Sequence, residues 1–158
     1  MFPCSTRKFD LTGTGSCGSF NLRRTARAVT RFYDLAFQDC GIRSTQFTIL
    51  VSIAKKQPTS MGALADLLVI DRTTLTRSLR LLKKEGLVAV SERSTMRQRF
   101  LTLTPQGEQM LERSLPYWRK AQERFVQALG SERWTSFRNE LEKLAHIVTD
   151  LEASGRSF

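Results

Sequence analysis

The chain has 158 residues, enough for one domain with a hydrophobic core or for one small module with an added oligomerisation layer. Lys and Arg number 25 against 15 Asp and Glu, so the formal net charge is +10 at pH 7, which favours a polyanionic partner. No apolar run reaches the roughly 20 residues that would span a bilayer, and no signal peptide is recognisable, so we expect a cytoplasmic protein without a membrane partner.

The N-terminal part of the chain predicts a flexible arm followed by a helix. Residues 1–18 are rich in Gly, Ser and Thr and lack hydrophobic periodicity. From about Ser19 to Asp39, apolar residues recur at intervals of three and four, as in an amphipathic helix. Arg23, Arg27 and Arg31 form an i, i+4 row on another face of it, which is either solvated or contacts DNA or an acidic partner.

Residues 44–104 have the order of elements of a winged helix-turn-helix. A helix beginning at Ser44 or Thr45 and ending near Pro58 comes first, and Ser60 can then cap a short helix. A tight connection leads to a second cap at Asp71 and a basic helix that ends at Gly86. Two β-prone runs, residues 87–90 and 100–103, enclose a polar and cationic tip, so they predict a two-stranded wing. In such modules the second helix of the pair enters the major groove of DNA.

The basic helix after Asp71 has one apolar side and one cationic side. Leu75, Ser78, Leu79, Leu81 and Leu82 fall on the first side, whereas the other carries Arg, Lys and Thr without an acid before Glu85. Arg and Thr are suitable donors to phosphates and base edges. A solvated structural face, and an ordinary surface hairpin for the wing, are the simpler alternatives. The predicted DNA-binding residues are Ser60, Arg72, Thr73, Thr74, Thr76, Arg77, Arg80, Arg93, Arg97 and Arg99.

The segment after the wing predicts two long helices. Thr104 can cap the first, with Pro105 at its first position, and Pro116 should kink it. Gly130 interrupts the helical pattern, and Ser131 is expected to cap the last helix. There, apolar residues repeat from Trp134 to Leu151 at an average spacing of 3.5, the seam of helices that pack at a shallow angle. We interpret this seam as part of a homodimer interface built with the first helix; packing within one chain is the alternative.

The predicted fold class is therefore mainly α with a small β-wing. It has six helices, of which the N- and C-terminal ones form a dimerisation layer. The domain organisation that we expect is an arm at 1–18, a dimerisation helix at 19–43, the winged helix-turn-helix at 44–104, dimerisation helices at 105–152 and a tail at 153–158.

The order of helices and the string DRTTLTRSLRLLKKEGLV…LTLTPQG resemble the MarR (multiple-antibiotic-resistance regulator) family, over roughly residues 19–151. The resemblance implies a homodimeric transcription factor that binds a palindromic operator in double-stranded DNA, usually as a repressor. It also implies release of DNA by a small phenolic or lipophilic ligand or by cysteine oxidation. The ligand would settle between the dimer helices and the winged module, where Tyr33, Phe47 and Trp118 could line a pocket. Each of the three is equally explained as a core residue, and we prefer the core.

This sequence departs from the family pattern at the wing. Most members carry an Asp-Arg-Arg-like triplet that aligns with Thr95, Met96 and Arg97, so only the last arginine is kept. The aspartate normally helps to hold the wing arginine. DNA affinity here is therefore expected to depend more on Arg93 and Arg99.

Three cysteines in a protein expected to be cytoplasmic predict free thiols. Cys40 is expected to be a small apolar residue packed in the core, whereas Cys4 and Cys17 lie in or near the arm, where exposure permits oxidation. The hydroperoxide-sensing branch of the family has its reactive cysteine at a position that aligns with Ser19, two residues after Cys17. Redox sensing through Cys17 is thus an alternative to ligand control, and unchanged operator affinity after peroxide treatment would exclude it.

Nothing in the sequence predicts an enzyme, a metal site or a cofactor. His146 is the single histidine, and no cysteine lies at ligand spacing from it. No phosphate-binding glycine loop or nucleophile elbow is present. A winged-helix module for protein–protein assembly, with weak DNA binding, is the remaining alternative. A fully cationic and hydroxylated helix face argues against it.

Overall fold

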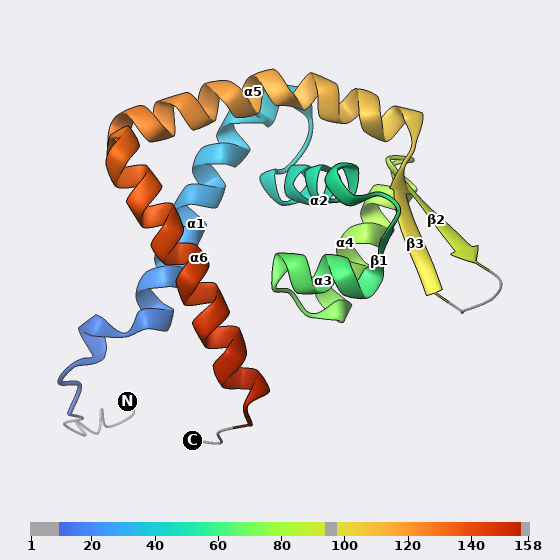
Figure 1. Ribbon diagram of the computed structural model, residues 1–158. Helices are drawn as coiled ribbons and strands as arrows, with labels where there is room; N and C mark the ends of the chain where they lie inside the picture. Colours follow the sequence, from blue (N-terminus) through green and yellow to red (C-terminus); the bar gives the residue numbers. More distant parts are fainter. Residues whose placement is uncertain (1–9, 94–97, 156–158) are drawn as a thin grey trace, which may run out of the picture.

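A computed structural model describes residues 10–93 and 98–155 of the chain. It confirms the predicted fold class, six α-helices with a small antiparallel sheet (Figure 1). The helices are α1 (Gly18–Ala36), α2 (Ser44–Lys56), α3 (Met61–Leu68), α4 (Arg72–Lys84), α5 (Pro105–Leu129) and α6 (Ser131–Ala153). The strands are β1 (Thr59–Ser60), β2 (Val88–Arg93) and β3 (Gln98–Leu103), and two short 3-10 turns are η1 (Thr14–Ser16) and η2 (Gln38–Cys40).

The elements form two regions under one long helix. In Figure 1, α5 arches across the molecule, with α2, α3, α4 and the sheet beneath one end and α1 and α6 descending at the other. The first region is the winged module, and in the second the start of α1 and the end of α6 lie away from α5. No helix in the described part of the chain is long and apolar enough to cross a membrane.

The hydrophobic core lies in the winged module. Leu50 and Ile53 of α2, Leu64 of α3, and Leu75 and Leu82 of α4 are completely buried. Phe37, just after α1, enters this core and its ring lies 4.9 Å from that of Phe47. Because buried apolar area is the main stabilising term, this core is what holds the module together.

The helix caps follow the local sequence in three of four predicted places. The Ser60 and Thr104 hydroxyls accept from the N–H groups of Ala63 and Gly107, at 3.1 and 3.0 Å, and Asp71 caps α4. The expected cap at Ser131 is wrong, because Gly130 is the N-cap residue and Ser131 is already helical. Gly130 adopts φ 85°, a conformation that suits glycine, and ends α5 and begins α6 without a linker.

Other expectations for the elements need small corrections. The sheet has three strands in the order β1-β3-β2 rather than two, because Thr59 and Ser60 pair with Leu101 and Phe100 of β3. A two-residue strand is too short to show alternation, so the sequence carried no signal for it. Leu81 was expected on the apolar side of α4 but is 48% exposed. The first helix ends at Ala36 instead of Asp39, and α5 continues as one helix past Pro116.

The junction of the wing with α5 is closely packed. Thr104 N–H donates to the Leu87 carbonyl oxygen at 3.2 Å, and Leu87 N–H donates to the Leu82 carbonyl oxygen at 2.9 Å. Gly107 is buried against the same backbone, and a Cβ at this position would lie 2.0 Å from the Leu87 oxygen. Only glycine therefore allows the first turn of α5 to approach the Leu87 backbone, just before β2, so closely.

Candidate nucleic-acid interface

The N-terminus of α4 is held by a local network. Asp71 Oδ1 accepts from Thr74 N–H at 2.8 Å, and Asp71 Oδ2 accepts from the Thr74 hydroxyl at 2.6 Å. These two hydrogen bonds lower the pKa of the Asp71 carboxyl below its ordinary value of 3.8, despite its exposure. The cap is therefore ionised at neutral pH. Its contribution to stability is present above pH 3.8 and is lost as the pH falls through the lowered pKa.

The turn that joins α3 to α4 contains an unusual residue that sequence reasoning did not identify. Val69 adopts φ 50° and ψ 49°, the left-handed region, and its side chain is 64% exposed. For a residue other than glycine this conformation costs roughly 1–2 kcal/mol. It is held by hydrogen bonds from Val69 N–H to the Asp66 oxygen and from Ile70 N–H to the Ala65 oxygen. The tight turn thus sets how α4 projects from α3.

The outer face of α4 presents an uninterrupted set of cationic and hydroxyl groups. Leu75, Leu79 and Leu82 are buried, which directs the opposite side of the helix to solvent. Five of the predicted DNA-binding residues are exposed there and line one shallow hollow of about 360 Å³: Arg72, Thr73, Thr76, Arg77 and Arg80. The helix contains no acid, so nothing on it neutralises the three arginines. Such a face can bind phosphates and the acceptor atoms of bases.

Two other predicted DNA-binding residues have roles within the protein. The Thr74 hydroxyl donates to Asp71, and the Ser60 hydroxyl serves as the cap of α3. Both hydroxyls retain acceptor or donor capacity, so contacts with DNA remain a prediction for them.

The wing extends from the module as the β2–β3 hairpin (Figure 1). Its register pairs Val88 with Leu103 at the base and Arg93 with Gln98 toward the tip. Arg99 is exposed on β3. Arg97, Thr95 and Met96 lie outside the described residues. The contribution of the predicted wing arginines therefore stays a prediction.

A separate cavity of about 520 Å³ lies between α1, α2 and α5. Tyr33, Phe47 and Trp118 all line it, although Phe47 is also part of the core. The rings of Phe47 and Trp118 stack with centroids 6.3 Å apart, and the Tyr33 hydroxyl donates to Gln122 Oε1 at 2.6 Å. Burial raises the pKa of Tyr33 above 10.0, so it is a neutral phenol at pH 7.

Polar groups at this cavity were missed by sequence reasoning. Hydroxyls of α1 and α2 and one ammonium group line it beside the apolar side chains: Thr30, Ser44, Thr45, Thr48, Ser52 and Lys55. The spacing of Ser44, Thr48, Ser52 and Lys55 at intervals of three and four marks one helix face. The sequence alone does not say that this face meets α1.

The remaining candidate residues are placed apart from the α4 face. Cys17 is exposed and immediately precedes α1 as its N-cap residue. Cys40 is buried, as expected, with its sulfur 3.2 Å from the Ser114 oxygen. Cys4 lies outside the described residues. His146 is exposed on α6, and the described part of the chain holds no group of three residues able to bind a metal ion.

Comparison with known proteins assigns this architecture. Residues 42–95 match the model of the MarR family. The transcriptional regulator MosR of M. tuberculosis, solved in complex with DNA, is 30% identical and superposes with a TM-score of 0.78 over 85% of this chain and 98% of that one. MarR of E. coli in its apo form is 19% identical, with a TM-score of 0.64 over 81% of this chain and 96% of the other, and shows the shared fold.

Comparison with curated protein sequences also finds helix-turn-helix-type transcriptional regulators, matched over part of this chain. An uncharacterised helix-turn-helix-type transcriptional regulator of Staphylococcus aureus is 37% identical over 68 residues, which is 42% of this chain and 47% of the relative. The chain thus spans about half the length of the curated relatives that it matches. With the family model covering the helix-turn-helix and MosR covering nearly the whole fold, the chain belongs to the MarR family of transcriptional regulators, which are not enzymes.

Proposed function

We propose that this protein regulates transcription by binding a palindromic operator in double-stranded DNA, most simply as a repressor. One observation carries the proposal: the exposed face of α4 bears Arg72, Arg77 and Arg80 without an acid on the helix. MosR, its relative with 30% identity, was solved in complex with DNA, which supports the same partner here. Such a protein works in the compartment that holds DNA, in line with the cytoplasmic location expected from the sequence.

The proposal is tested by removing one arginine from the α4 face and measuring the affinity for DNA. We expect Arg77→Ala to lower affinity for a duplex selected by the wild-type protein from a random pool about tenfold, and to reduce the slope of log affinity against log salt by about one if Arg77 contacts a phosphate. Binding is measured by fluorescence anisotropy at several salt concentrations.

Arg119→Ala is the matched control. Arg119 is exposed on α5, so its substitution removes the same charge at a site away from α4. Its affinity should stay within twofold of the wild type, and its salt slope should be unchanged. If Arg77→Ala and Arg72→Ala both behave like this control, the assignment of α4 as the recognition helix fails.

The proposed regulator is a homodimer. No residue of α1 or α6 is buried, although both helices carry apolar side chains. Along α6, five large apolar residues are more than a third exposed: Phe137, Leu144, Ile147, Val148 and Leu151. Phe20 and Leu22 of α1 are 55% and 43% exposed. Apolar surface repeated at helical spacing favours a helical partner, and a second copy would place two α4 helices on successive half-sites.

We further propose that a small aromatic or lipophilic molecule releases DNA by binding in the cavity between α1, α2 and α5. Its volume of about 520 Å³ is in the usual range for small-molecule sites. The lining combines aromatic rings with a row of hydroxyls, and Lys55 can pair with an anionic group. A ligand there would contact the dimer layer and the winged module at once.

Benzoate and phenol are suitable probes of this cavity. We expect benzoate to reduce DNA affinity at least threefold in the wild type, and more than phenol because only benzoate pairs with Lys55. Ser52→Phe, which fills part of the cavity, should abolish the response without changing DNA affinity in the absence of probe. Equal responses in wild type and Ser52→Phe would place any effector elsewhere.

A further inference from the structure

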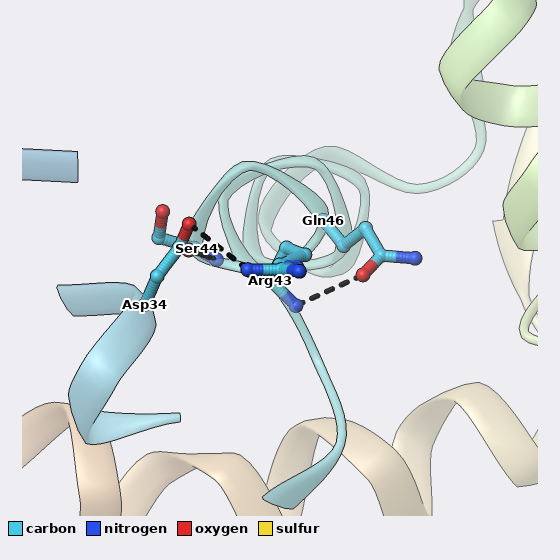
Figure 2. Close-up of polar contacts among 4 residues, drawn as sticks. All are labelled: Asp34, Arg43, Ser44 and Gln46. Atoms are coloured by element: carbon cyan, nitrogen blue, oxygen red, sulfur yellow. Dashed lines mark hydrogen bonds and ion pairs between the residues drawn. The ribbon is translucent and has the colours of Figure 1, made fainter. Parts of the chain in front are cut away.

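The N-terminus of α2 is capped by a residue of another helix. Ser44 N–H, one of the donors left free at a helix start, donates to Asp34 Oδ1 of α1 at 2.7 Å (Figure 2). The N-cap residue itself is Arg43, whose side chain has no acceptor. Asp34 therefore supplies the cap that the local sequence lacks.

The same carboxylate also holds the residue before α2. Asp34 Oδ2 lies 3.6 Å from the Arg43 guanidinium, and the Asp34 side chain is only 22% exposed. A carboxylate at a helix N-terminus is favoured by the helix dipole as well as by this cation. Both interactions join α1, in the region proposed to dimerise, to the first helix of the winged module.

A second contact continues from α2 to α4. Gln46 Oε1 accepts from Arg43 N–H at 2.9 Å (Figure 2), and Gln46 Nε2 donates to Glu85 Oε2 at 3.2 Å. Glu85 is the C-cap residue of α4. A chain of polar contacts thus leads from Asp34 to the end of the recognition helix.

The polar contacts lie beside a hollow in which the side chains of α1 and α4 are not closely packed. A hollow of about 730 Å³ lies where α1, the start of α2 and the end of α4 meet, and its lining includes Asp34, Gln46 and Glu85. Leu35 of α1 and Leu81 of α4 border it and are 70% and 48% exposed. Phe37 and Ile42, which also line this hollow, are buried in the core, so the polar contacts act beside that packing, on the exposed side of the junction between α1 and the module.

We propose that Asp34 is a positioning residue for DNA recognition, which sets the distance and angle between the two α4 helices of the dimer by capping α2 from α1. The inference rests on the proposed function, since it requires two copies bound to paired half-sites. In B-DNA one added base pair moves the second half-site by about 3.4 Å and rotates it by about 35°. If the two α4 helices are held rigidly, the dimer should therefore bind well only to a duplex with one spacing between its half-sites.

The experiment uses the full chain and the duplex selected by the wild-type protein, together with versions lengthened or shortened by one base pair between half-sites. We expect the wild type to lose at least tenfold in affinity on either altered duplex. Asp34→Ala should bind the selected duplex three- to tenfold more weakly, and its loss on the altered duplexes should shrink to threefold or less. Asp34→Asn keeps an acceptor for Ser44 N–H but not the charge, so it should fall between them.

Asp39→Ala is the matched control, because Asp39 is an exposed acid of η2 and its removal changes the net charge equally. It should keep the wild-type spacing preference. A role of Asp34 in stability alone would lower binding to all duplexes by the same factor and would overturn the proposal, as would an unchanged spacing preference in both Asp34 variants. A wild-type protein that selects no duplex would instead refute the proposed function, and this inference with it.

Discussion

Gly107→Ala should lower the free energy of unfolding by roughly 3 kcal/mol, which for a chain of this size means a fall in Tm of roughly 6–12 °C. The added Cβ would lie 2.0 Å from the Leu87 carbonyl oxygen and 2.9 Å from its carbon. The Leu87 backbone cannot retreat cheaply, because its N–H is bonded to Leu82 and its oxygen accepts from Thr104. Urea denaturation followed by circular dichroism measures the change.

Gly62→Ala is a matched control within the same module. Gly62 lies in α3, and the nearest atom to an added Cβ is the tip of the Arg72 side chain at 3.8 Å, an ordinary contact. Alanine has the higher helix propensity, so this change should stabilise the protein by about 0.5 kcal/mol. A loss below 1 kcal/mol for Gly107→Ala would show that the wing and α5 separate easily, contrary to the packing described.

Placing carboxylates on the apolar face of α6 should dissociate the proposed dimer. Ile147 and Leu151 are one helical turn apart and are 57% and 52% exposed in the single chain. If a second copy covers them, Ile147→Asp with Leu151→Asp would bury two unpaired charges, and the dissociation constant should rise at least about 100-fold. Sedimentation equilibrium measures it, and affinity for a paired-site duplex should fall in parallel.

Asn139→Asp provides the control for added charge on the same helix. Asn139 is exposed and lies opposite the seam of Trp134, Leu141 and Val148 on a helical projection. It should leave the dimer intact. A wild-type protein that sediments as a monomer, or a double variant that remains dimeric, would contradict the proposed interface.

Features that depend on a few neighbouring residues could be predicted from the sequence. The caps at Ser60, Asp71 and Thr104 were correct because each acceptor bonds an N–H three residues ahead. The cationic face of α4 also followed from periodicity alone, since Leu75, Leu79 and Leu82 had to be buried together. The error at Ser131 has a local cause as well, because the chain turns at Gly130 and leaves no residue for a separate cap.

Features that depend on distant partners required the tertiary structure. Residue spacing does not show that Asp34 caps α2 across a turn, that Gly107 faces the Leu87 carbonyl, or that β1 pairs with β3. Spacing also does not bring Tyr33, Phe47 and Trp118 to one cavity; only the family resemblance implied that the three could line a pocket together. The sequence by itself determined the six helices, the β2–β3 wing, the caps at Ser60, Asp71 and Thr104 and the charge of α4, because those follow from local hydrogen bonds and side-chain periodicity. The tertiary structure decided how α1 and α5 hold the winged module, because those contacts join residues far apart in the chain.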